Sequence, residues 1–161
     1  MKKMLLALMI LTSAASFANT KVKTQEVLTG DQVLAMLNTA FKEAKDNKLN
    51  VSITIVDKAG RRMGLIRTED SGVHTVDASY KKAYTAASLK NPTLEIGKRI
   101  QEGKIPSDLK YLDENFTTVE GGLPIKINGT VVGGIGVGGA RSDQDAQIAT
   151  KALETLDKIT K

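Results

Sequence analysis

Apolar positions recur at helical spacing in three separate parts of the chain. The first run covers residues 29–48 and opens on a capping box, in which Thr29 precedes Gln32 by three positions. The same spacing returns over residues 75–87 and again from Ser142 to the C-terminus. The pattern therefore predicts an N-terminal, a central and a C-terminal helix, each with one buried face.

Four segments are predicted to be strands. Residues 51–56 alternate and are rich in β-branched residues, and residues 63–67 return as the second strand of a hairpin. Residues 124–127 and the glycine-rich residues 130–138 form a second pair. The second pair is joined by Asn128-Gly129, the strongest short signal for a hairpin turn. The chain therefore contains two predicted β-hairpins, separated by helices.

The segment between the central helix and the second hairpin is less regular. Asn91-Pro92 ends the central helix, and Thr93 is the predicted cap of a short helix that ends near residue 103. One helical turn is expected after Pro106, and residues 116–119 are a weak candidate for a further strand. The predicted fold is α+β: an antiparallel sheet of about four to five strands, packed by the N-terminal, central and C-terminal helices on at least one face.

The start of the chain has the three parts of a secretory signal. Lys2 and Lys3 precede a short apolar run, and small residues follow to Ala18. The run is shorter than the roughly 20 apolar residues that a membrane span needs. We therefore expect residues 1–18 to be a signal peptide, 19–28 a flexible lead-in, and 29–161 a single domain. The protein would be exported, periplasmic or secreted, with no membrane anchor after cleavage.

Composition restricts the chemistry of this domain. The chain has no cysteine, which removes disulfides, thiolate catalysis and cysteine-ligated metals. It has one histidine, so it cannot supply the three or four ligands of a bare zinc or copper site. Haem or a corrinoid brings its own equatorial ligands and needs only one or two from the protein. The net charge is +5, but positive and negative residues are mixed along the chain and aromatic residues are few. A nucleic-acid partner is therefore set aside.

The single histidine, His74, lies where a loop enters the central helix. Asp70 and Asp77 are near it in sequence, and Ser71 or Ser79 could complete a Ser-His-Asp triad. Such a triad is disfavoured because its three members would come from one loop and one helical turn, and no nucleophile elbow is present. An enzyme is therefore a less favoured interpretation than a binding protein.

Two further features admit both a structural and a functional interpretation. Gly134, Gly136 and Gly138 fall in a G-x-G-x-x-G match, but no second strand follows the helix, so the dinucleotide interpretation is rejected. The glycines would instead let a helix or a bound ring lie flat against the sheet. Lys81 and Lys82 are expected on an exposed helix flank, where they are either solvated or anchor carboxylates.

Several blocks of sequence together resemble the GlcG/HbpS-like family, and they span residues 30–160 in the family's order. They are residues 51–57 with Gly60, Arg67, Gly72-Val73-His74-Thr75, Lys82-Ala83-Tyr84-Thr85-Ala86-Ala87-Ser88, residues 121–125, and residues 129–139. In this chain Thr68-Glu69-Asp70 replaces the Met-Asp-Gly often found after the arginine, which affects the expected loop shape more than the fold.

The resemblance implies a small α+β domain that assembles into homo-oligomers. Characterised members include extracytoplasmic haem-binding proteins, while others are encoded beside glycolate oxidation enzymes or form the C-terminal part of a cobalamin-processing adenosyltransferase. In haem-binding members a threonine or a histidine of this region is associated with iron, and the matching positions are Thr85 and His74.

Two hypotheses of function follow. In the first, an exported protein stores, carries or senses haem, with His74 or Thr85 at the iron and Arg67, Lys81 or Lys82 near the propionates. The remaining predicted pocket residues are Tyr84, Gly134, Gly136 and Gly138. In the second, a non-enzymatic oligomeric accessory module binds a small organic acid or a partner protein in an oxidation pathway.

Overall fold

The structure is a computed structural model that describes residues 24–159. The predicted signal peptide and residues 19–23 of the predicted lead-in lie outside the described residues. In chain order the elements are α2 (Gly30–Asp46), β1 (Ser52–Asp57), β2 (Arg62–Arg67), α3 (Thr75–Leu89), α4 (Thr93–Gln101), the 3-10 helix η2 (Ser107–Tyr111), β3 (Gly122–Ile127), β4 (Thr130–Gly138) and α5 (Ser142–Ile159). Within this range no helix is both long and apolar enough to cross a bilayer.

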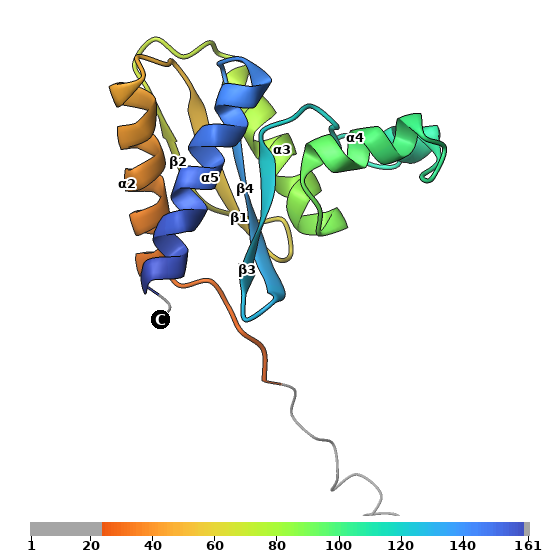
Figure 1. Ribbon diagram of the computed structural model, residues 1–161, viewed down its shortest axis with the longest axis horizontal. Helices are drawn as coiled ribbons and strands as arrows, with labels where there is room; N and C mark the ends of the chain where they lie inside the picture. The colour runs from red at the N-terminus through yellow and green to blue at the C-terminus, as the bar shows by residue number, and fades with distance from the viewer. Residues whose placement is uncertain (1–23, 160–161) are drawn as a thin grey trace, which may run out of the picture.

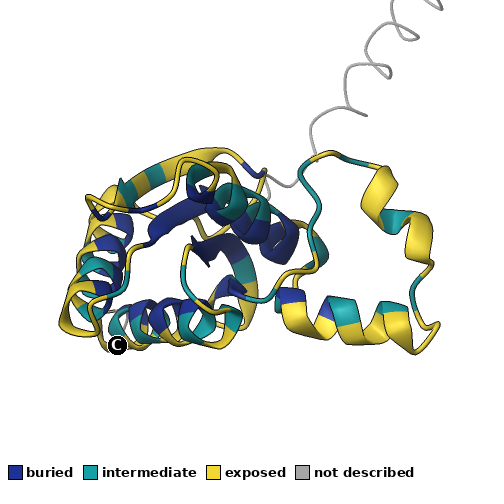
Figure 2. Ribbon diagram, turned by 90° about the horizontal axis from the view of Figure 1, so that it is seen from above, coloured by how far each residue is buried: buried dark blue, intermediate teal, exposed yellow. Residues whose placement is uncertain are grey.

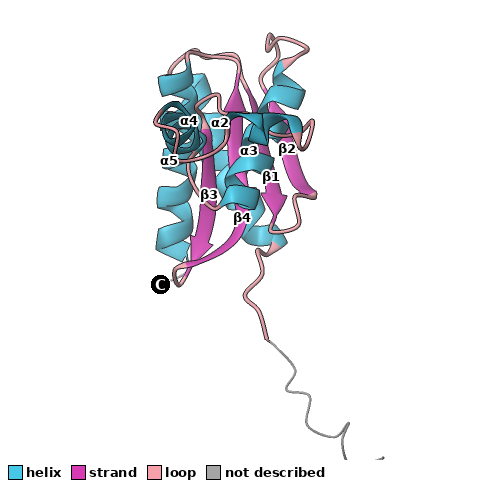
Figure 3. Ribbon diagram, turned by 90° about the vertical axis from the view of Figure 1, so that its right-hand side faces the viewer, coloured by secondary structure: helices cyan, strands magenta, loops and turns pink. Residues whose placement is uncertain are grey.

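The four strands form one antiparallel sheet in the order β2-β1-β4-β3. Each hairpin supplies an inner and an outer strand, and the two inner strands pair from Ser52 with Gly138 to Asp57 with Gly133. Helices α2 and α5 lie side by side on one face of the sheet, and α3 covers the other (Figures 1 and 3). The predicted α+β class, with a sheet made of two hairpins, is confirmed, and helices cover both faces.

The larger hydrophobic core lies between the sheet and the pair α2 and α5. Alternate residues of the inner strands, such as Ile53, Ile55 and Ile135, point toward Met36 of α2 and Ala149 of α5. All of these side chains are buried. Alternation in the strands and helical spacing in α2 and α5 are thus both explained by this one core.

The opposite face of the sheet meets α3 at very short range. Position 136 is glycine because a Cβ there would lie 2.1 Å from the carbonyl oxygen of Ser79, and a Cβ at position 134 would lie 2.2 Å from that of Ala83. The hydroxyls of Ser52 and Thr54 on β1 are 2.7 Å from those of Thr75 and Ser79 on α3. The neighbour that the glycines of β4 admit is therefore a helix, and Gly134 and Gly136 do not line a ligand pocket.

Two local predictions are corrected by the structure. Residues 116–119 form no strand, because the loop is held by the side chain of Thr85 and Phe116 packs on Tyr84 with ring centroids 5.9 Å apart. Thr93 does not cap α4, since Pro92 occupies the cap position. The hydroxyl of Thr93 instead accepts a hydrogen bond from the Gly122 amide (3.1 Å) and ties α4 to β3.

Between α3 and β3 the chain forms an arm, residues 92–119, that projects from the three layers (Figure 1). It contains α4 and η2, and most of its residues are exposed (Figure 2). The buried side chains of Thr93 and Ile96 attach α4 to the body of the domain. The arm is thus anchored mainly at its base.

Candidate functional site

A pocket of about 350 Å³, here called the α3–α5 pocket, lies where the first half of α3 meets the start of α5. Its wall is completed by the end of β4 and by the loop that returns from the arm. The lining residues are His74, Ala78, Lys81, Lys82, Thr117, Val119, Gly138, Gly139, Ala140, Ser142 and Asp145. Four of the predicted site residues therefore meet here: His74, Lys81, Lys82 and Gly138.

His74 stands at the rim of this pocket. It occupies the cap position of α3 in a helical conformation, and its side chain makes no capping hydrogen bond. The residue is exposed, and no hydrogen bond or ion pair joins its imidazole to any other described residue. The imidazole is therefore available to a metal centre or to a ligand that enters the pocket.

The floor of the pocket holds an ion pair between Lys82 and Asp145, and the predicted exposed position of Lys82 is wrong. Lys82 is not on an exposed flank: it is only 3% exposed, and its ammonium donates to Oδ2 of Asp145 at 2.8 Å. Asp145, 1% exposed, also accepts from the Ala140 amide at 3.1 Å. Burial raises the pKa of Asp145 above its ordinary range, more than the hydrogen bond and charge of Lys82 lower it.

Lys81 lies next to this pair in sequence but differs in its surroundings. It is half-buried, lines the same pocket, and has no ion-pair partner among residues 24–159. Of the two lysines, it is therefore the one whose charge is not already compensated by a carboxylate.

Thr85, the second predicted iron ligand, is in a different environment. Its hydroxyl accepts from the Thr117 amide at 2.9 Å and donates to the Asn115 carbonyl at 3.3 Å. The cavity it borders, below the arm, has a volume of about 10 Å³. That volume holds about one water molecule, so this cavity cannot accept a macrocycle. Thr85 anchors the returning loop.

Two other predicted pocket residues also lie outside the α3–α5 pocket. The Tyr84 hydroxyl donates to Oδ2 of Asp113 at 2.6 Å, and this hydrogen bond raises the pKa of Tyr84. The guanidinium of Arg67 donates to the hydroxyl and carbonyl oxygens of Ser71, at 3.0 and 2.6 Å. Arg67 therefore stabilises the loop before α3 and does not line the pocket.

Sequence reasoning missed Asp145. It lies three and four positions before Ile148 and Ala149, on the buried face of α5. A carboxylate on an apolar helical stripe is the signal that could have identified it, because a buried acid requires a partner.

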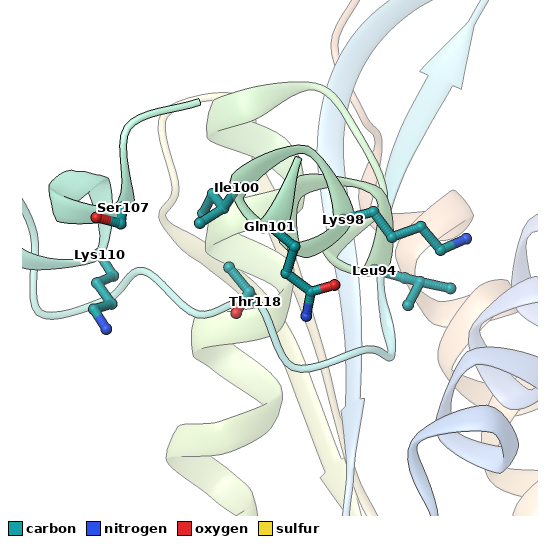
Figure 4. Close-up of a pocket in the computed structure, with 8 residues that line it drawn as sticks. Leu94, Lys98, Ile100, Gln101, Ser107, Lys110 and Thr118 are labelled. Atoms are coloured by element: carbon teal, nitrogen blue, oxygen red, sulfur yellow. The ribbon is translucent and has the colours of Figure 1, made fainter. Parts of the chain in front are cut away.

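A second pocket, of about 310 Å³, lies within the arm and contains none of the predicted residues. Figure 4 shows Lys98 and Gln101 on α4, Ser107 and Lys110 on η2, and Thr118 on the returning segment. The Lys98 ammonium donates a hydrogen bond to Glu95, and both Lys98 and Lys110 are exposed. The described residues include no cluster of three or more His, Cys, Asp or Glu that could hold a metal ion, in this pocket or elsewhere.

Comparison with known proteins gives one consistent result. The family described as haem-degrading, HbpS-like proteins matches residues 28–154. An uncharacterised 15.0 kDa protein of Citrobacter freundii, from the dhaT-dhaS intergenic region, is 32% identical over 140 residues, which are 85% of this chain and 99% of that protein.

Solved structures agree with the sequence match. A double mutant of HbpS from Streptomyces reticuli superimposes with a TM-score of 0.79 at 29% identity, over 86% of this chain and 92% of that one. The structure of a PduOC–haem complex gives a TM-score of 0.76 at 27% identity, over 81% of this chain and 95% of the other. From the family match and the shared fold, the chain belongs to the HbpS-like family.

Proposed function

We propose that this protein binds haem in the α3–α5 pocket, with His74 as the iron ligand. The observation that carries the proposal is the unengaged imidazole at the rim of a pocket whose volume, about 350 Å³, falls within the range of small-ligand sites. The match to a PduOC–haem complex supports the same ligand class.

The residues around His74 fit an amphipathic macrocycle. Val73 beside it is 87% exposed, and Val119 on the facing loop is 53% exposed, so apolar surface borders the mouth of the pocket. Such exposed apolar residues at a concave site are typical of ligand contacts. Lys81 offers an uncompensated cation to the carboxylates of the ligand.

The bound haem would supply an iron centre, and the residues around the pocket would hold it. His74 would donate a nitrogen lone pair, and Val73 and Val119 would exclude water from one side. Thr85 would take no part at the iron, because both hydrogen-bonding functions of its hydroxyl are used by the loop at residues 115–117.

A haem titration followed by absorption tests this proposal. Residues 19–161 should saturate near one haem per chain with a shifted Soret band. His74→Ala should lose that band position and weaken binding at least about tenfold, the effect of losing one strong ligand. Thr85→Val, which removes the hydroxyl but keeps the shape, should retain the wild-type spectrum.

The two variants control each other, since His74 caps α3 and lines the pocket while Thr85 lies on α3 outside it. A spectrum that changes with Thr85→Val and not with His74→Ala would refute the assignment of the ligand. A featureless titration that does not saturate in any variant would refute haem binding itself.

We further propose that the protein is exported and acts as a homo-oligomer. The pattern of residues 1–18 supports export, and the exposed Tyr111 and Leu112 of the arm, 78% and 77% exposed, offer apolar area for subunit contact. The mass of the protein recovered from the periplasm should correspond to a chain that starts near Asn19. An intact Met1 in that fraction would contradict export by cleavage.

A further inference from the structure

We propose that Lys82, with Asp145 behind it, forms a carboxylate-binding subsite at the floor of the α3–α5 pocket. No step of haem ligation by His74 uses this pair. Its placement is unusual for the molecule, because the other ion pairs among the described residues join exposed or partly exposed side chains. Here both side chains are at most 4% exposed.

The ammonium of Lys82 has unfilled hydrogen-bonding capacity. An ammonium has three N–H donors. In the described structure Lys82 makes a single hydrogen bond, to Asp145, although it is almost completely buried. Because a buried donor without an acceptor is costly, an oxygen acceptor in the adjoining pocket would stabilise this side chain.

The charge of the pocket favours an anionic ligand. Of its ionisable lining residues, Lys81, Lys82 and His74 are basic and Asp145 alone is acidic. The pocket also opens at the N-terminal end of α5, where Ser142 begins a helix of 18 residues and the helix dipole favours negative charge. A ligand anion is therefore preferred over a cation or a second base.

The pocket also has an apolar part, which limits the kind of anion that fits. Ala78, Val119 and Ala140 give the pocket apolar wall beside these donors. A ligand with a carboxylate and a short aliphatic part would contact both the donors and the apolar wall. Two ligands have this chemistry. One is the propionate arm of haem, and the inference then rests on the proposed function. The other is a free short-chain acid, and the inference then does not depend on haem binding.

Asp145 gives the proposal a test that does not depend on losing structure. Its carboxylate competes with a ligand carboxylate for the same ammonium. Asp145→Asn keeps an oxygen that can accept from Lys82 or from the Ala140 amide, but it removes the competing charge. A carboxylate ligand should then bind more tightly, a gain that an unfolded variant cannot produce.

The experiment measures binding of propionate by calorimetry, with propionamide as the uncharged probe of equal size. In the full mature chain, propionate should bind at least about tenfold more tightly than propionamide, as expected for a charged hydrogen bond. Asp145→Asn should tighten propionate binding about tenfold or more. Lys82→Gln should weaken it by a similar factor, while Lys126→Met, at an exposed lysine of β3 that does not line this pocket, should change it by no more than about twofold.

A second arm distinguishes the two sources of the carboxylate. If the propionate of haem is the ligand, haem dimethyl ester should bind at least about tenfold more weakly than haem, through loss of a charged contact. Equal binding of haem and its ester, with the propionate results intact, assigns the subsite to a free acid. If haem does not bind at all, the proposed function fails and the propionate arm still decides this inference.

Two results would overturn the subsite. One is propionate binding no better than propionamide in the wild-type chain. The other is an Asp145→Asn variant that folds, as judged by its circular dichroism, and binds propionate no more tightly than wild type. Either result would leave the Lys82–Asp145 pair as a purely structural contact between α3 and α5.

Discussion

Replacing Lys82 by Met is expected to lower the free energy of unfolding by about 3–5 kcal/mol, the usual cost of removing one partner from a buried ion pair. The substitution leaves the carboxylate of Asp145 buried without its cation, in a helix that must pack against the sheet. Asp145 also holds the Ala140 amide, so the start of α5 should loosen with it. Urea denaturation, with the unfolding slope compared between variants, measures the change.

A double variant separates lost charge pairing from lost packing. Lys82→Met combined with Asp145→Leu removes both charges, and replacing both members of such a pair by apolar residues is often close to neutral. We expect the double variant to recover at least half of the lost stability. If Lys82→Met alone unfolds at the same urea concentration as Lys81→Met, whose half-buried lysine has no ion-pair partner among the described residues, the pair contributes no such energy.

A second large effect is expected at position 136. Gly136→Ala should destabilise the fold by about 3 kcal/mol or more, at the upper end of what overpacking costs. The added Cβ would lie 2.1 Å from the carbonyl oxygen of Ser79 and 2.5 Å from the amide nitrogen of Ala83. Both atoms belong to the backbone of α3, so neither can move aside without displacing the helix.

Gly30→Ala is the matched control for this experiment. No atom lies within 4 Å of a Cβ added at Gly30, and the position starts α2. Its stability should change by at most about 1 kcal/mol, in the direction of stabilisation. Thermal unfolding of both variants measures the difference. A Gly136→Ala protein with the same melting temperature as Gly30→Ala would show that α3 does not pack on β4 as described.

The parts of the fold that depend on local pattern could be predicted from the sequence. The capping box at Thr29 is present, with Gln32 bonded in both directions, and α2 ends at Asp46, close to the expected residue 48. The turn at Asn128-Gly129 has positive φ at both residues, 48° and 77°, as a tight hairpin turn requires. In each case the physical cause lies within a few residues of the signal.

The candidate site was less predictable, because its properties arise from contacts between distant segments. Nothing near Lys82 in sequence shows that its partner is Asp145 on the last helix. The hydroxyl of Thr85 is engaged by residues 115 and 117, in a loop whose path depends on the arm. The exposure of His74 could be predicted, because a loop entering a helix exposes its side chains whatever the remainder of the chain does.

The pairing of β1 with β4 also determines how the chain must fold. Each hairpin can close by itself, but the centre of the sheet joins the first strand to the last, Ser52 to Gly138. Closing that long loop costs chain entropy before any central contact forms, a cost that slows folding relative to a helical bundle of the same size. A growing polypeptide that ends before residue 138 has β2 but lacks the complete β4, the inner partner of β1, so the four-stranded sheet cannot form until most of the chain has been made.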